Sequence, residues 1–360
     1  MISVGRLVEK KSDLRYNAPM HLTVARQLFV MAVIVVISFF FSRKNKFGQK
    51  ESQFLSRILL YVINPCMIVS TFDVDFDREK LKFLALAIGV SFVFHLVMII
   101  MATLLFARKK NLQEQSALQD QKARDALSKI GIVFTNSGFI GIPLINGVFG
   151  GEGVFYLMGY ILVFNILLWF WGEWIVTGAM RPLKILANPN VIACAAGLVV
   201  FCVPFRMPYA VIEPLRMIGS CNGAVSMMLL GLLFASFGGD KSLTGQSAAD
   251  DRLQEQKAAA TIRAYARPLA RDVALRLLAC PLILLFATLF ALRAFDFVHE
   301  IKLIMSVLFI AAACPVGMSV SSFAVVFKKD ADYASLLVAV SSAACIVTIP
   351  LLVALLEALA

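Results

Sequence analysis

The sequence predicts an all-α polytopic membrane protein with ten transmembrane helices in two inverted repeats of five. The 360 residues are 60% hydrophobic and only 16% charged, well below the quarter that is usual in soluble domains. Because a membrane span needs about 20 apolar residues, the chain has room for about ten spans. Two of the expected spans also contain clusters of helix-breaking residues, and these two occupy equivalent places in the two halves of the chain.

Composition excludes several other classes of protein. The net charge of +11 is interpreted as loop charge that follows the positive-inside rule, so no nucleic-acid partner is expected. All seven cysteines fall inside apolar runs, where they act as small hydrophobic residues. Their spacing fits neither a disulfide framework nor a metal site, and no cofactor is expected.

Apolar runs divide the chain into a polar tail at 1–21, a first repeat at 22–178 and a second repeat at 179–360. The expected spans lie at about 23–41, 54–72, 83–107, 130–150, 154–177, 189–204, 215–237, 272–294, 303–326 and 333–358.

The distribution of lysine and arginine predicts the orientation in the membrane. Counted with the four adjoining residues of each flanking span, loops after the odd-numbered spans hold 21 of these residues, against 7 for loops after the even-numbered spans. The odd-numbered loops are therefore assigned to the cytoplasm, with both termini on the outer side of the plasma (inner) membrane. Basic residues in the polar tail oppose this assignment, but the difference between the loops is spread over many segments.

The fourth span is interrupted near its middle. Its helix breakers are Asn136, Ser137, Gly138, Gly141 and Pro143. Proline removes a backbone donor and leaves a carbonyl of the preceding turn without its helical partner. Inside a membrane, unpaired backbone groups are tolerated only where they line a cavity or face protein. The interruption is therefore a candidate binding site.

The ninth span is interrupted in the same way, at Cys314, Pro315 and Gly317, with Ser319 following. Spans 4 and 9 are equivalent if the chain is divided after span 5. Since five is odd, the two halves would insert with opposite orientations, as in inverted-repeat transporters. The second halves of both spans would begin near mid-membrane, where their N-terminal amides favour an anionic group. The alternative is a pair of structural kinks.

Polar residues in spans 2 and 7 are candidates for the opposite wall of this site. They are Asn64, Ser70, Asn222 and Ser226.

Three ionisable residues within spans are candidates for ion coupling, because such residues are costly in a membrane. His95 lies near the middle of span 3 and either carries a coupling proton or is a neutral packing residue. Glu173 and Arg276 are expected to lie at similar depth and to form a pair, which is structural or takes part in coupling. Arg276 pairing with Asp272, one turn earlier, is the alternative.

The segment from Asn136 to Leu144, Asn-Ser-Gly-Phe-Ile-Gly-Ile-Pro-Leu, resembles the fourth-helix motif of the auxin efflux carrier family, which includes plant PIN proteins and many bacterial permeases. Other short motifs occur in the same order along residues 22–358. They are Asn64-Pro65, Asn188-Pro189, the Met-Met-Leu-Leu-Gly-Leu-Leu of span 7, the Ala-Cys-Pro-Val-Gly that ends at Gly317, and Thr348-Ile-Pro350-Leu.

The resemblance implies ten helices in two inverted repeats, with helices 4 and 9 crossing at mid-membrane. It implies a scaffold of spans 1, 2, 6 and 7, through which a homodimer would form, and a moving domain of spans 3–5 and 8–10 that works as an elevator. Family substrates are organic anions, namely auxin in plants and dicarboxylates such as malate or malonate in bacteria. Thr135 stands where plant members have proline, and the long central loop of the plant carriers is missing, which favours the bacterial-type branch.

These observations predict a secondary active transporter of a small organic anion in a lipid bilayer, with a proton or sodium ion as the candidate coupling ion. A membrane receptor or sensor that uses the same fold without transport is the alternative. An enzyme is not expected, because the spans contain no metal-ligand set, paired carboxylates or Ser/His/Asp grouping.

Overall fold

The computed structural model describes residues 19–106, 115–179, 187–203, 207–236, 265–294 and 299–360, so almost all of the predicted polar tail lies outside the described residues. The described segments are helical, with one isolated β-bridge between Thr135 and Val316. Among them, seven helices are long and apolar enough to cross a membrane, and Pro189–Cys202 is a shorter apolar helix. An all-α membrane architecture is therefore confirmed.

The first half of the chain contains α-helices and π-helical turns, the latter labelled η. They are α2 (Met20–Lys44), α3 (Gln49–Ile58), η1 (Leu59–Ile63), α4 (Asn64–Thr71), α5 (Arg78–Leu105), α6 (Gln115–Val133), η2 (Ser137–Gly141), α7 (Ile142–Leu167), η3 (Leu168–Gly172) and α8 (Glu173–Thr177).

The second half contains α10 (Pro189–Cys202), α11 (Tyr209–Ser220), α12 (Asn222–Ser236), η4 (Leu275–Ala279), α14 (Cys280–Ala294), α15 (His299–Ala313), α16 (Met318–Val326) and α17 (Ala331–Leu359). A helical segment at 265–274 leads directly into η4.

Prolines explain three of the π-helical turns. η1, η2 and η4 each end two residues before a proline, at Pro65, Pro143 and Pro281. The ring of a proline clashes with the carbonyl four residues earlier and offers it no N–H. A wider π turn moves that carbonyl aside while the helix continues. The helix of span 2 therefore continues through Asn64-Pro65.

Gly150 divides α7 into two helical parts. Its φ of 68° is the only non-helical backbone conformation within α7. A left-handed φ is readily adopted by glycine, which has no Cβ. The segment from Ile142 to Phe149 thus follows the interruption of span 4, and the longer remainder continues through η3 into α8 as span 5.

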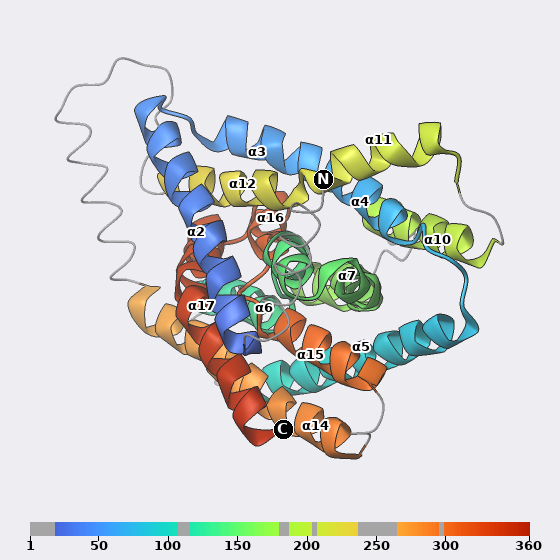
Figure 1. Cartoon of the computed structure of the whole chain (residues 1–360). Coiled ribbons are helices and arrows are strands. Elements are labelled where there is room, and N and C mark those ends of the chain that lie inside the picture. The colour runs from blue at the N-terminus through green and yellow to red at the C-terminus, as the bar shows by residue number, and fades with distance from the viewer. Residues whose placement is uncertain (1–18, 107–114, 180–186, 204–206, 237–264, 295–298) are drawn as a thin grey trace.

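The segment Ser137–Thr177 lies at the centre of the protein, with 67% of its most apolar part buried, against 28% for α2. Figure 1 shows α7 surrounded by the other helices, and α5 and α15 both pack against it. The outer helices instead expose large apolar side chains, such as Phe29 on α2 and Phe290 on α14, which are suited to contact with lipid.

α2 is held between α12 and α17 (Figure 1). Gly231 allows the close approach of α12, because a Cβ at this position would collide with the carbonyl oxygen of Val35 and lie 2.7 Å from the Cβ of Ser38. The hydroxyl of Ser38 donates to the carbonyl of Met228 at 2.7 Å. Small residues that let helix backbones approach are typical of membrane interfaces.

Candidate substrate-binding site

The interruptions of spans 4 and 9 lie against each other. α6 ends at Val133 and α15 ends at Ala313. Between the helical pieces, Thr135 and Val316 form the antiparallel β-bridge. The amide of Asn136 donates to the carbonyl of Pro315 at 2.7 Å, and the amide of Gly317 donates to the carbonyl of Phe134 at 2.9 Å. The two extended segments thus satisfy each other's backbone groups, as a low-dielectric interior requires.

Local sequence explains why these segments are extended and close together. Pro315 cannot donate to the preceding turn of α15. At Gly317, an added Cβ would lie 2.8 Å from the carbonyl oxygen of Thr135, so only glycine fits. At Gly141, a Cβ would lie 3.4 Å from the Sγ of Cys314, which places the start of α7 beside the interruption of span 9.

Polar groups are buried at the starts of the second helical pieces. Asn136 is 2% exposed and Ser137 is fully buried. Within the described part of the chain, Asn136 Nδ2 and the hydroxyl oxygens of Ser137 and Ser319 have no hydrogen-bond partner. Burying an unpaired polar group costs about 1–3 kcal/mol. These atoms are therefore available to a ligand, and Gly138 nearby has open space on its Cβ side.

A second buried polar group lies on α4 and α12. Asn222 Nδ2 donates to Asn64 Oδ1 at 2.7 Å, and both side chains are buried. The remaining oxygen of Asn222 and the hydroxyl of Ser226 have no partner among the described residues. α12 contacts η2, and a Cβ on Gly223 would lie 3.2 Å from Pro143. The structure therefore joins Asn64 to Asn222, and Asn222 and Ser226 belong to a helix, α12, that contacts η2.

Ser70 has a different environment. Its hydroxyl donates to the carbonyl of Met67 at 3.0 Å, within its own helix. No contact links it to the polar group around Asn222, so the structure does not join Ser70 to the other predicted site residues within the segments it describes.

His95 is packed among aromatic rings. Its ring centroid lies 4.6 Å from that of Tyr160 and 6.4 Å from that of Phe134. Its Nδ1 lies 2.7 Å from the carbonyl of Ser91, which requires a proton on that nitrogen. Nε2 has no hydrogen-bond partner in the described segments. Both alternatives for His95, a packing residue and a proton carrier, stay predictions.

Arg276 is fully buried and donates to backbone carbonyls of both interrupted spans. Asp272, one of its two predicted partners, instead accepts from Tyr333 Oη at 2.5 Å and Arg271 Nε at 2.8 Å. Glu173 is buried at the start of α8, and its ion pair with Arg276 stays a prediction.

Sequence reasoning missed several neighbours of the interruptions. The hydroxyl of Ser341 accepts from the amide of Val316 at 3.2 Å, and Gln27 donates to the carbonyl of Pro143 at 3.3 Å. The hydroxyls of Tyr160 and Thr135 are 3.4 Å apart. Gln27 is a polar residue within an apolar span, which is a signal that the sequence contained. Ser341 and Tyr160 carry no comparable signal.

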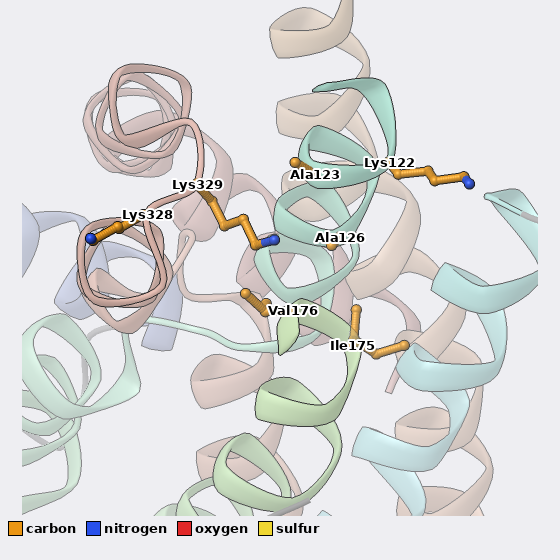
Figure 2. Close-up of a pocket in the computed structure, with 7 residues that line it drawn as sticks. All are labelled: Lys122, Ala123, Ala126, Ile175, Val176, Lys328 and Lys329. Atoms are coloured by element: carbon orange, nitrogen blue, oxygen red, sulfur yellow. The ribbon is translucent and has the colours of Figure 1, made fainter. Parts of the chain in front are cut away.

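A pocket of about 320 Å³ lies elsewhere, between α6, α8 and the turn that precedes α17, and three lysines line it. Figure 2 shows the side chains of Lys122 and Lys328 directed away from each other, with only that of Lys329 extending between the helices. Because the three ammonium groups do not converge, the pocket lacks the arrangement that would hold a small anion. The interruptions remain the better candidate site.

The sequence profile of the family described as "membrane transport protein" matches residues 23–178 and 174–353. The chain belongs to this family. It is the auxin efflux carrier and PIN-like family, so the resemblance found in the sequence is confirmed. No curated protein matches the chain. Membership of the membrane transport protein family, together with the apolar helices, indicates an integral membrane transporter that binds a small molecule.

Proposed function

We propose that the protein is a secondary active transporter of a small organic anion, held where spans 4 and 9 cross. The observation that carries the proposal is the buried group of unpaired polar atoms on Asn136 and Ser137, at the start of a helix whose N-terminal amides favour negative charge. A carboxylate would accept hydrogen bonds from these donors and is the anionic group we expect.

We further propose ten spans in two inverted repeats. In this view, spans 4 and 9 cross the membrane as pairs of shorter helices, and α10 is a short span. The two backbone bonds between the interruptions support it, because they are related by symmetry. In each bond, a residue of one segment donates to the residue two positions before the donor of the other segment. The two matched stretches, 23–178 and 174–353, lie close to the predicted halves of the chain.

An elevator motion is the transport mechanism that we propose for this arrangement. α2 and α12 would form the scaffold with α4 and α10, and the crossing would move past them with its bound anion. The contact between α12 and η2 supports this division, because each side of it carries unpaired buried polar atoms: Asn222 and Ser226 on α12, and Asn136 just before η2. The orientation with both termini outside and the homodimer remain predictions.

The test is flux into proteoliposomes of radiolabelled malonate, malate and indole-3-acetate. We expect uptake of at least one of these anions, and its loss in Asn136→Ala. Asn165→Ala is the matched control, because Asn165 is also buried but its amide donates to the carbonyl of Ile161 in its own helix at 2.8 Å. Normal flux in folded Asn136→Ala would contradict the proposed site. Binding of an anion without flux would favour the receptor alternative.

A further inference from the structure

Arg276 occupies an unusual position for a charged residue. It lies in η4, within the helix Tyr265–Ala294, and its side chain is fully buried. Its Nε donates to the carbonyl of Cys314 at 3.0 Å, and its two terminal nitrogens donate to the carbonyls of Ile132 at 2.8 Å, Cys314 at 2.9 Å and Ala312. The Sδ of Met98 lies 3.3 Å from one terminal nitrogen. These contacts employ the whole guanidinium group.

The carbonyls that Arg276 binds are those that the interrupted helices leave unpaired. Ile132 is in the last turn of α6, Ala312 is in the last turn of α15, and Cys314 follows directly after α15. The last carbonyls of a helix have no intrahelical partner. In transporters with interrupted helices, such carbonyl ends coordinate the coupling cation. Here a side chain of the protein occupies that position.

The guanidinium charge offsets the negative helix ends of this arrangement. Each helix C-terminus carries about −0.5 elementary charge, so the ends of α6 and α15 together offer about −1 to the guanidinium. The N-terminal ends of η2 and α16 carry about +0.5 each. Without Arg276, the partial charges of the four helix ends would nearly cancel. Counting these four helix ends alone, Arg276 neutralises the negative ends and the positive ends remain.

We propose that Arg276 permanently fills the cation position of the crossing, in place of a sodium ion, and thereby leaves the crossing positive toward an anionic substrate. The role of this charge in anion transport rests on the proposed function. The filled cation position itself can be tested without measuring transport. Lysine would not replace Arg276 fully, because its point charge lacks the planar fork that reaches three carbonyls at once.

Thermal unfolding of the full-length protein in nanodiscs tests the proposal, at constant ionic strength. We expect the Tm of the wild type to be the same in sodium chloride and choline chloride. We expect Arg276→Ala to have a lower Tm that rises by several degrees with low millimolar guanidinium, which can enter the vacated position. Sodium should also raise the Tm of this variant relative to choline.

Arg293→Ala is the control for nonspecific effects of guanidinium, because Arg293 is on the same helix but exposed, where it donates to the carbonyl of Leu359 at 2.8 Å. Its Tm should not rise with guanidinium. A rise in Arg276→Ala no larger than in this control would overturn the proposal.

If Arg276→Ala does not fold, two further measurements decide. Arg276→Lys should fold with an intermediate Tm that responds weakly to guanidinium. The comparison of sodium with choline on the wild type needs no variant, and stabilisation by sodium there would show that the cation position is not filled. If the wild type transports none of the tested anions, the proposed function is contradicted, but the conclusion from these stability measurements is not affected.

Discussion

The amide nitrogen of Asn136 lies 2.7 Å from the carbonyl oxygen of Pro315, so the residue that ends the interruption of span 4 is bonded to the proline that interrupts span 9. The reciprocal bond, from Gly317 to Phe134, completes a two-bond link. Backbone bonds in a low-dielectric interior are costly to break without replacement. The two interruptions are therefore expected to move as one body during any transport cycle.

Gly317→Ala should destabilise the protein through this link. The new Cβ would lie 2.8 Å from the carbonyl oxygen of Thr135 and 3.1 Å from that of Phe134, and backbone atoms cannot easily move aside. Overpacking of this kind costs about 1–3 kcal/mol. Unfolding in mixed micelles with increasing SDS measures the change. Gly89→Ala is the control, since nothing lies within 4 Å of its Cβ position; it should be neutral or stabilising. Equal stability of the two variants would contradict the prediction.

Asn64→Ala should destabilise the scaffold by about 1–3 kcal/mol, because it leaves the buried amide of Asn222 without its acceptor. A double-mutant cycle with Asn222→Ala should give a coupling energy of about 1 kcal/mol. The same unfolding measurement applies. Asn45→Ala, at the exposed end of α2, should change the free energy of unfolding less. Additive effects of the two scaffold substitutions would show that the bond contributes nothing.

Gly150→Ala should cost about 1–3 kcal/mol, because its φ of 68° and ψ of −159° lie in a region that is essentially restricted to glycine. Gly151→Ala is a close control. Nothing lies within 4 Å of the Cβ position of either glycine, but only Gly150 has a positive φ. Thermal unfolding should therefore separate two substitutions of the same type at neighbouring positions. Similar Tm values would mean that the turn does not require the left-handed conformation.

Glu357→Ala should destabilise the contact between α17 and α2. The carboxylate of Glu357 accepts from the amides of Met20 and His21 at the start of α2 and also contacts Nδ1 of His21. Loss of a helix N-cap costs about 0.5–2 kcal/mol. Glu79→Ala removes an exposed pair with Lys82, worth about 0.2–0.5 kcal/mol, and should have the smaller effect on the Tm. The reverse order would contradict the capping role.

Much of the helical architecture follows from local sequence. Prolines and glycines indicated where spans 4 and 9 would be interrupted, and the structure ends α6 and α15 within a few residues of those positions. The boundary between spans 4 and 5 is also visible in the sequence, because it falls at a glycine-rich stretch, and Gly150 there adopts the positive φ that divides α7. These features depend on backbone chemistry, which a sequence displays directly.

The partners of polar side chains were not predictable in the same way. The sequence suggests carboxylate partners for Arg276, whereas its bonds to the carbonyls of Ile132 and Cys314 depend on two distant helices ending beside it. Asp272 is a plausible partner of Arg276 by spacing, yet its carboxylate accepts hydrogen bonds from Tyr333 and Arg271. The hydrogen-bond partners of these side chains depend on which helix ends lie together in the folded protein. The pairing of Asn64 with Asn222 likewise becomes visible only in the folded protein, although both had been selected as site residues.

The bonds of Glu357 to the start of α2 have a consequence for the order of the chain. They hold the last long helix at the point where the first begins, so the two ends of the helical body are adjacent. A linker could join residue 360 to residue 19, and new termini could open between the two halves near residue 183. Such a circularly permuted chain would place the second half before the first while keeping every helix contact, so the present order of the halves is one of two that the architecture accepts.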